Sequence, residues 1–417
     1  MSGPSTQHRT SPWPAVSYPR RFRETEPVNH RIGRPLRRLI RQDTPDPALL
    51  DTIGRRLTAR DETGAALARA IRIADPADPD KVTMAQFEQA LTGGIEQVPD
   101  APRPLRDFFA VVDTVPDWVD FDLVNEGGRT FRRFGRTVAD VLLQLALIGS
   151  YRFGGASDLL VATGALTGTK TRRRLAETQH WATTLSGHDA LRRPGAGFRL
   201  TVHVRLMHAL VNHRFETHGR WDVGRWGLPI NRSDLAATLG LFNAVSLLGV
   251  RLLGVRVTRA ESRAVMHMWR YTGWLMGVDE DWLHDSERSQ HRLNYHLLLT
   301  QSYGGPAGPP LAKAAVDAQR TLHFRHFARQ RGTYARERLL SMLGFFIGRK
   351  GVRDLGLPYR LPWAVPPLLA VNFLHHHILG RTAIGRRYLL GHGDRAIRKL
   401  LRQYFGEDMP DVAELRS

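Results

Sequence analysis

The stretch RLTVHVRLMHALV, residues Arg199–Val211, decides the fold because its apolar residues recur with the period of an α-helix. On a helical wheel, one face of this helix carries the imidazole of His208. Val204, Arg205 and Val211 lie on the same face, whereas the other apolar residues point elsewhere into packing. The stretch therefore predicts a core helix that presents a histidine, an arginine and two valines together.

Two interpretations of His208 are compatible with these residues. A single histidine on a helix is most often a core residue that is hydrogen-bonded to a backbone carbonyl. The same face also fits a flat hydrophobic cofactor, which would lie against Val204 and Val211 with the imidazole as ligand of its metal. Arg205, one turn earlier, would then meet an acidic group on the cofactor rim in the paired geometry that a guanidinium favours. The residues alone leave both interpretations open.

Length and charge limit the class of protein. With 417 residues we expect one large helical domain with appended segments, or two domains. The 60 basic residues outnumber the 40 acidic ones, and the net charge of +20 favours anionic partners. This charge is spread along the chain without interleaved aromatic residues, so we expect no nucleic-acid partner. Basic clusters beside apolar segments near the C-terminus favour peripheral contact with an anionic membrane instead.

The chain contains no cysteine. Its absence excludes disulfides, zinc ribbons, iron–sulfur clusters, thiolate haem ligation and cysteine nucleophiles. Any iron ligand must therefore be a histidine, tyrosine, methionine or carboxylate.

Helical patterns dominate the chain, repeats of 20 to 50 residues are not visible, and alternating strand patterns are scarce, so the sequence predicts an all-α protein. In the N-terminal part we expect helices at Arg34–Gln42, Ala48–Ala74 and Val82–Thr92. Turn-rich breaks at Ala74–Asp80 and Val98–Pro104 interrupt the helical pattern.

These patterns divide the chain into four parts. Residues 1–30, rich in proline, serine and arginine, are expected to be a disordered or loosely docked arm. Residues 31–104 form an N-terminal helical segment, 105–300 the core that contains His208, and 301–417 a C-terminal helical segment packed on that core.

Two segments bear on localisation. The run Arg20–Arg23 is similar to a twin-arginine export signal, but no apolar stretch comes after it before Arg31, so we expect no signal peptide and a cytoplasmic protein. The segment between Arg360 and Arg381 has nearly the length of a membrane span. Because three prolines break its first half and three histidines stand in its second, a membrane-surface helix or a core helix is expected rather than a span.

A second informative stretch is Gly164–Trp181, in which a turn leads into a helix beginning near Lys170. Arg174, Glu177 and Thr178 share one face of this helix with Trp181. Taken alone, the pattern is typical of an arginine-rich solvated helix with a contact between Arg174 and Thr178.

Two further stretches predict packing rather than chemistry. In Trp226–Phe242, Asn231 or Ser233 supplies a helix N-cap. Met266–Gly277 is an aromatic and methionine helix of the core.

Taken in order, these stretches resemble the family of haem-dependent oxygenases that includes the bacterial latex clearing proteins (rubber oxygenases) and the fungal MpaB-type oxygenases. Each motif is weak alone, but six in one order are specific. The resemblance runs from about Val115 to Leu283, and its carriers are Val115–Val119, Gly154–Gly164, Arg173–Thr178, Val204–Ala209, Gly227–Asn231 with Asp234, and Trp269–Gly273 with Gly277.

The resemblance implies an all-α fold with a globin-like multi-helix haem-binding core and additional N- and C-terminal helices. It implies that His208 is the proximal ligand of a b-type haem and that Arg205 belongs to the same signature. Arg174 and Thr178 match the family's distal arginine and threonine.

Two distal positions differ from the rubber oxygenases. Asp158 lies where those proteins have a carboxylate proposed as a base in alkene oxidation, and it is one methylene shorter. Glu177 takes the place of a lysine that can ligate iron in members with a closed distal site. Since a glutamate is a poor substitute for a neutral amine ligand, we expect an iron open to water or dioxygen.

The resemblance thus implies a haem b-dependent oxygenase that uses dioxygen on a carbon–carbon double bond of an apolar, isoprenoid or lipid-like substrate. Arg174 and Thr178 would polarise dioxygen, and Asp158 or Glu177 would move protons. Two alternatives remain: a non-catalytic haem-binding or membrane-surface protein of the same fold, and a basic protein without cofactor that docks on anionic surfaces.

Overall fold

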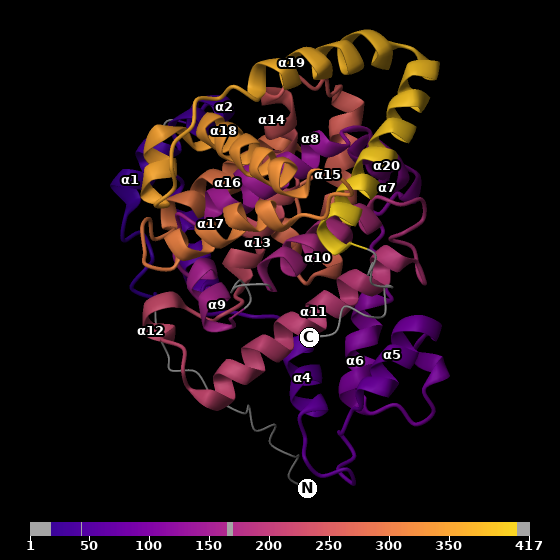
Figure 1. Cartoon of the computed structure of the whole chain (residues 1–417). Helices are drawn as coiled ribbons and strands as arrows, with labels where there is room; N and C mark the ends of the chain where they lie inside the picture. Colours follow the sequence, from indigo (N-terminus) through magenta and orange to yellow (C-terminus); the bar gives the residue numbers. More distant parts are fainter. Residues whose placement is uncertain (1–17, 43, 165–169, 407–417) are drawn as a thin grey trace, which may run out of the picture.

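The computed structural model describes residues 18–42, 44–164 and 170–406 (Figure 1). In these ranges the regular structure is helical, and extended segments meet at a single isolated bridge between Phe153 and Tyr303. The all-α prediction is confirmed.

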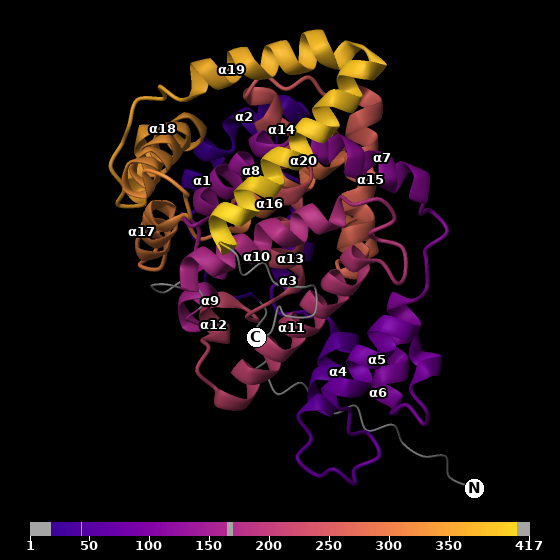
Figure 2. The same cartoon turned by 45° about the vertical axis from the view of Figure 1, so that its right-hand side comes forward.

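The N-terminal helices fall into two groups. Helices α4, α5 and α6 form a lobe beside α11 (Ala196–His218), as Figure 2 shows, whereas α1, α2 and α3 pack against α16 (Glu287–Thr300). Their bounds are α1 Glu26–Ile32, α2 Arg34–Ile40, α3 Pro47–Arg56, α4 Glu62–Ile71, α5 Met84–Gly93, η1 Ile95–Gln97 and α6 Arg103–Val112.

The single helix expected over Ala48–Ala74 is wrong, because the chain leaves the helix between α3 and α4. Backbone carbonyls in this break accept hydrogen bonds from a distant part of the chain. Leu57 O accepts from Leu228 N at 2.9 Å, and Ala59 O accepts from Arg232 N at 3.0 Å. Hydrogen bonds to a distant part of the chain therefore compensate for those that a continuous helix would have made.

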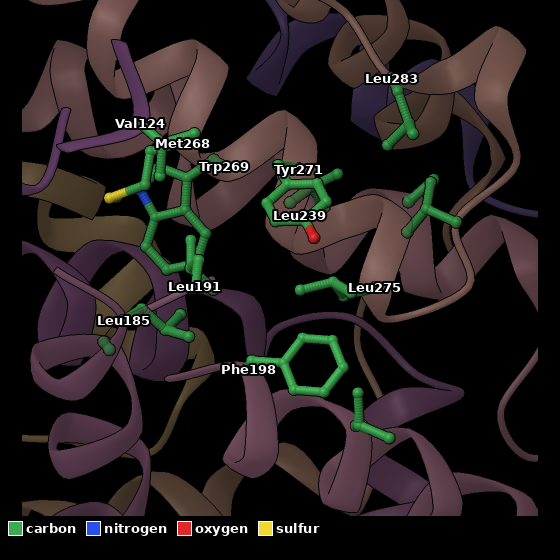
Figure 3. Packing of buried hydrophobic residues seen from close by; sticks show 14 of the residues in the cluster. Val124, Leu185, Leu191, Phe198, Leu239, Met268, Trp269, Tyr271, Leu275 and Leu283 are labelled. Atoms are coloured by element: carbon green, nitrogen blue, oxygen red, sulfur yellow. The ribbon is translucent and has the colours of Figure 1, made fainter. Parts of the chain in front are cut away.

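The middle of the chain supplies most of the core. Trp269 of α15 is fully buried, with ring centroids of Phe131, Trp181 and Phe242 at 5.6, 5.7 and 5.1 Å. Figure 3 shows it among the apolar side chains of this core. The remaining helices of this part are α7 Phe121–Arg133, α8 Arg136–Val141, η2 Leu142–Ile148, α9 Ala156–Ala162, α10 Lys170–Leu185, α12 Val223–Trp226, α13 Arg232–Phe242, α14 Ala244–Leu252, α15 Arg259–Leu275 and η3 Glu280–Trp282.

The C-terminal helices cover one end of this core and then return to it. Helix α20 runs back across the molecule and packs on α7 and α10 (Figure 1). The bounds are α17 Gly308–Asp317, η4 Ala318–Thr321, α18 Ala328–Asp354, α19 Val365–Phe373, η5 Leu374–Ile378, η6 Leu379–Arg381 and α20 Ala383–Phe405.

The expected loosely docked arm over residues 1–30 is wrong for residues 18–30, whereas residues 1–17 lie outside the described part. Arg21 and Asn29 are fully buried. Arg21 Nη2 lies 2.5 Å from Asp234 Oδ2, and Asn29 Nδ2 donates to the carbonyl of Gln301 at 2.6 Å. The core thus supplies a partner to one polar group of each side chain, and this part of the segment is buried in spite of its low hydrophobicity.

In the described residues, one helical stretch, Arg232–Leu252, is long and apolar enough to cross a bilayer by length and composition alone. Half of its most apolar window is buried inside the fold. This is weak evidence for a span, since a core helix passes the same test.

Candidate active site

Helix α11 carries His208 in its middle. It ends at Gly219, whose φ of 62° is the left-handed conformation that terminates many helices. His208 is half-buried, and its Nδ1 atom is fully buried without a hydrogen-bond partner among the described residues. A core histidine bonded to a backbone carbonyl is therefore not what the structure contains at this position.

The surroundings of His208 keep its imidazole neutral. Burial and the nearby Arg174 guanidinium lower its pKa to about 4, against the opposing effect of the Asp61 carboxylate. At neutral pH the ring therefore has a lone pair on one nitrogen, as a metal ligand requires.

Arg205 makes a different contact from the one expected. Its Nε and Nη2 atoms lie 2.7 and 3.0 Å from the two carboxylate oxygens of Asp61, and Nη1 donates to the carbonyl of Leu275 at 3.4 Å. The backbone of Gly277 closes over the guanidinium: a Cβ there would lie 3.0 Å from Arg205 Nε. The fork that was expected to meet an acidic cofactor group is thus occupied by a carboxylate of the chain itself.

Asp61, at the start of α4, faces both Arg205 and His208. Burial raises the pKa of its carboxyl, but the Arg205 guanidinium, the backbone N–H of Gly64 and the charge of Arg232 together hold the pKa below its usual value. A cavity of about 20 Å³ lies between these side chains and is also lined by Asn212 and Asn231. Its volume suits a single water molecule, to which the polar side chains in its wall can hydrogen-bond.

The residues around this cavity are fixed by hydrogen bonds. Asn212 exchanges two with the backbone of Ile230, each of 2.9 Å. Of the two N-caps that the sequence allowed, Asn231 caps α13 by accepting from Asp234 N at 2.9 Å. Arg232 pairs with Asp279. This side of His208 is therefore a closed, internally paired region.

Helix α10 packs on α11 and brings Arg174, Glu177 and Thr178 together. The Glu177 carboxylate lies 3.0 Å from Arg173 Nε and 3.3 Å from Arg174 Nη1. The Thr178 hydroxyl donates to the carbonyl of Arg174 at 3.2 Å. Because Arg174 also acts on the pKa of His208, this polar face of α10 lies within electrostatic reach of the imidazole.

Asp158 stands apart from this group. Its carboxylate accepts from the backbone N–H of Gly155 at 3.0 Å, at the start of α9. Among the described residues it makes no hydrogen bond or ion pair with Arg174, Glu177, Thr178 or His208. The structure therefore gives Asp158 a capping role and leaves Glu177 as the carboxylate beside Arg174.

The two valines expected beside His208 are half-buried. Val211 packs against an apolar cluster of Phe215, Trp221, Val223 and Leu228, which Leu159 of α9 also joins. Val204 lies one turn before His208 on the same helix.

Sequence reasoning missed Asp61 and Arg21. Asp61 was placed inside a continuous helix, although an aspartate followed by Glu62 is a common helix start and is a local signal for the break. Arg21 carries no such signal, because its pairing with Asp234 depends on the tertiary fold. In the described residues no group of three or more His, Asp or Glu side chains gathers to hold a metal ion.

Comparison with known proteins identifies relatives of this chain. Residues 134–377 match the family model described as "ER-bound oxygenase mpaB/B'/Rubber oxygenase, catalytic domain". The matched region continues past residue 300, the predicted end of the core that contains His208.

A curated rubber oxygenase from Streptomyces sp. (strain K30) is 24% identical over 200 residues, which cover 47% of each chain. The match thus spans about half the length of this relative.

The solved structure of latex clearing protein LCP in the closed state has the same fold, with a TM-score of 0.60 and 18% identity over 83% of this chain and 90% of that chain. Since the family match covers more than half of the sequence, the chain belongs to the MpaB and rubber oxygenase family.

Proposed function

We propose that this chain is a haem b-dependent oxygenase that uses dioxygen on a carbon–carbon double bond of an apolar, isoprenoid or lipid-like substrate, with His208 as the iron ligand. Family membership supports an oxygenase. The observation that carries the haem assignment is the neutral imidazole of His208. Its buried Nδ1 has no hydrogen-bond partner in the described chain, and Arg174 of α10 is close enough to lower its pKa.

Three features of the described residues support this cofactor. A porphyrin supplies four nitrogen ligands, so one histidine from the protein is enough. Val204 and Val211 offer half-buried apolar surface on the same helix. The closed region around Asp61 and Arg205 would hold the histidine in place rather than bind the rim of the cofactor.

Haem, when bound, would supply an iron at which dioxygen is activated. The Arg174 side chain, 58% exposed, would supply hydrogen-bond donors and positive charge on the side of His208 that α10 faces. Glu177, next to that guanidinium, would hold or transfer a proton. The Thr178 hydroxyl, now bonded to a backbone carbonyl, would be a second donor after rotation of its side chain.

Titration with haemin tests the cofactor assignment. The purified protein is expected to be red, or to develop a Soret band on haemin addition, and His208→Ala is expected to lose this band while keeping its helical circular dichroism. His203→Ala is the matched control: His203 lies on the same helix but faces Glu88, with 3.4 Å between Nδ1 and Oε1. A folded protein that gains no Soret band would refute the proposal.

Oxygen uptake tests the reaction. Squalene and oleate are suitable probes because squalene is an apolar isoprenoid and oleate carries an apolar chain with one double bond. Oxygen consumption with either one, absent in His208→Ala, is the expected result. A red protein that consumes no oxygen with any unsaturated probe would instead be a non-catalytic haem-binding protein.

A further inference from the structure

In helix α19 and the turns after it, apolar side chains face outward and a polar side chain faces the core, the reverse of a helix that faces water. The polar side chain of Asn372 points inward, where it donates to the carbonyl of Leu253 at 2.7 Å and accepts from Thr137 at 3.2 Å. The outward side carries Val371, Phe373 and Leu374, each about half exposed (47–53%). A water-facing helix places its polar residues outward, so this surface is built for a medium other than water.

The exposed apolar residues continue beyond α19. We define the apolar ridge as Val371, Phe373, Leu374, Ile378, Leu379 and Ile384, all exposed. They follow one another in the sequence from α19 through η5 and η6 into the first turn of α20. The chain between the labels α19 and α20 forms an outer edge of the molecule in Figures 1 and 2. Soluble monomers rarely expose a run of this kind without a function for it.

The charge around the ridge has one sign. The sequence from Leu355 to Gly393 contains no aspartate or glutamate. Arg381, Arg386 and Arg387 are exposed within it, and none of the three forms an ion pair with a carboxylate of the described chain. Elsewhere many arginines are paired in this way, for example Arg338 with Asp140 at 2.6 Å. Arginines without a carboxylate partner beside exposed apolar side chains are typical of proteins that bind anionic membrane surfaces.

We infer that the apolar ridge, with Arg381, Arg386 and Arg387, docks this protein on the surface of an anionic lipid bilayer. The apolar side chains would enter the boundary between headgroups and acyl chains, and the arginines would lie at the phosphates. Contact between two copies through this surface would bring unpaired arginines together, which disfavours a dimer as its occupant. The inference is independent of the oxygenase proposal, because the ridge lies on the opposite side of the molecule from α11 in both views (Figures 1 and 2).

Vesicle flotation tests the ridge directly. The full chain is expected to float with phosphatidylcholine vesicles that contain phosphatidylglycerol, and to float poorly with phosphatidylcholine alone. The triple variant Leu374→Ser/Ile378→Ser/Ile384→Ser is expected to weaken partitioning at least about tenfold. Its matched control, Met84→Ser/Val111→Ser/Val115→Ser, changes exposed apolar residues in and beside the α4–α6 lobe and should float like the unmodified chain.

The arginines are tested in the same way. Arg381→Gln/Arg386→Gln/Arg387→Gln is expected to reduce binding to the anionic vesicles by about fivefold per arginine, on the order of a hundredfold in all, and to remove most of its salt dependence. Arg72→Gln/Arg103→Gln/Arg106→Gln makes the same change of charge in the lobe, where all three are exposed, and should have a much smaller effect.

Because the chain has no cysteine, one introduced cysteine gives a specific label. An environment-sensitive fluorophore on Ala370→Cys should shift to the blue with anionic vesicles, and one on Ala110→Cys should not. A folded chain that stays unbound at low salt, or ridge variants that bind as the unmodified chain does, would overturn the inference. So would a dimer that the ridge variant converts to a monomer and that vesicles do not recruit.

Discussion

His208 has two unlike sides. On the side of Asp61, charges are paired within the protein: Arg205 is 6% exposed and bonded through both edges of its fork. On the side of α10, Arg173 and Arg174 are 61% and 58% exposed, and their shared partner Glu177 lies between them. The difference indicates that the side chains on the first side are fixed by their partners within the protein, whereas those on the second side can still turn toward a ligand.

The largest effect is expected from breaking the closed side. Asp61→Asn leaves the Arg205 guanidinium buried without its counter-charge and should lower the free energy of unfolding by about 3–5 kcal/mol. Denaturant titration measures this value. Asp107→Asn, which breaks the exposed pair with Arg103 (3.4 Å), is the control and should change it by less than about 1 kcal/mol. Equal losses of unfolding free energy in the two variants would show that the buried and the exposed ion pair contribute equally to stability.

A change of pH reports on the imidazole between the two sides. Its pKa in the folded protein is about 4, below the ordinary 6.5, so the unfolded chain binds a proton first as the pH falls. The stability due to the neutral ring is complete above pH 6.5 and is lost between pH 6.5 and 4, by up to about 3 kcal/mol. In His208→Gln this part of the acid destabilisation should be missing. Parallel curves for both proteins over that range would contradict the pKa shift.

A smaller effect is expected where the backbone closes over Arg205. Gly277 has a φ of 82°, and a Cβ there would meet the guanidinium at 3.0 Å, so Gly277→Ala should cost about 1–3 kcal/mol. Thermal unfolding gives the comparison with Gly305→Ala, whose added methyl meets nothing within 4 Å. If both alanines are tolerated equally, the closed side is less tightly packed than its geometry indicates.

The smallest effect on stability is expected on the open side. Arg174→Gln removes an exposed charge and should change the free energy of unfolding by no more than about 0.5 kcal/mol. Because Arg174 lowers the pKa of His208, the same variant should raise that pKa, as measured by NMR of the imidazole in the haem-free protein. Arg173→Gln is the control, since Arg173 shares Glu177 but is not among the groups that shift the pKa of His208. If the pKa of His208 is unchanged in Arg174→Gln, the charge on α10 does not act on the imidazole.

Local patterns predicted much of this arrangement. The helical period around His208 predicted α11, and the spacing of Arg174 and Thr178 predicted their common face. One of the two predicted caps, Asn231, marks the start of α13. These features depend on residues within a few turns of one another, which is why one sequence can reveal them.

Long-range contacts explain what the sequence could not predict. The break before Asp61 exists because the carbonyls of Leu57 and Ala59 bind Leu228 and Arg232, far along the chain. The partner of Arg205 could not be predicted for the same reason: a guanidinium pairs with any carboxylate, and the tertiary fold determines which carboxylate lies beside it.

The burial of Arg21 has a consequence for how the protein is made. Its partner Asp234 lies 213 residues later, and Asp61 similarly precedes Arg205 by 144. During synthesis the early charge of each pair leaves the ribosome long before its counter-charge exists, so neither can be buried at that stage. The surroundings of His208 must therefore be completed late, after α13 has been made, and a nascent chain that stops earlier keeps these charges in water.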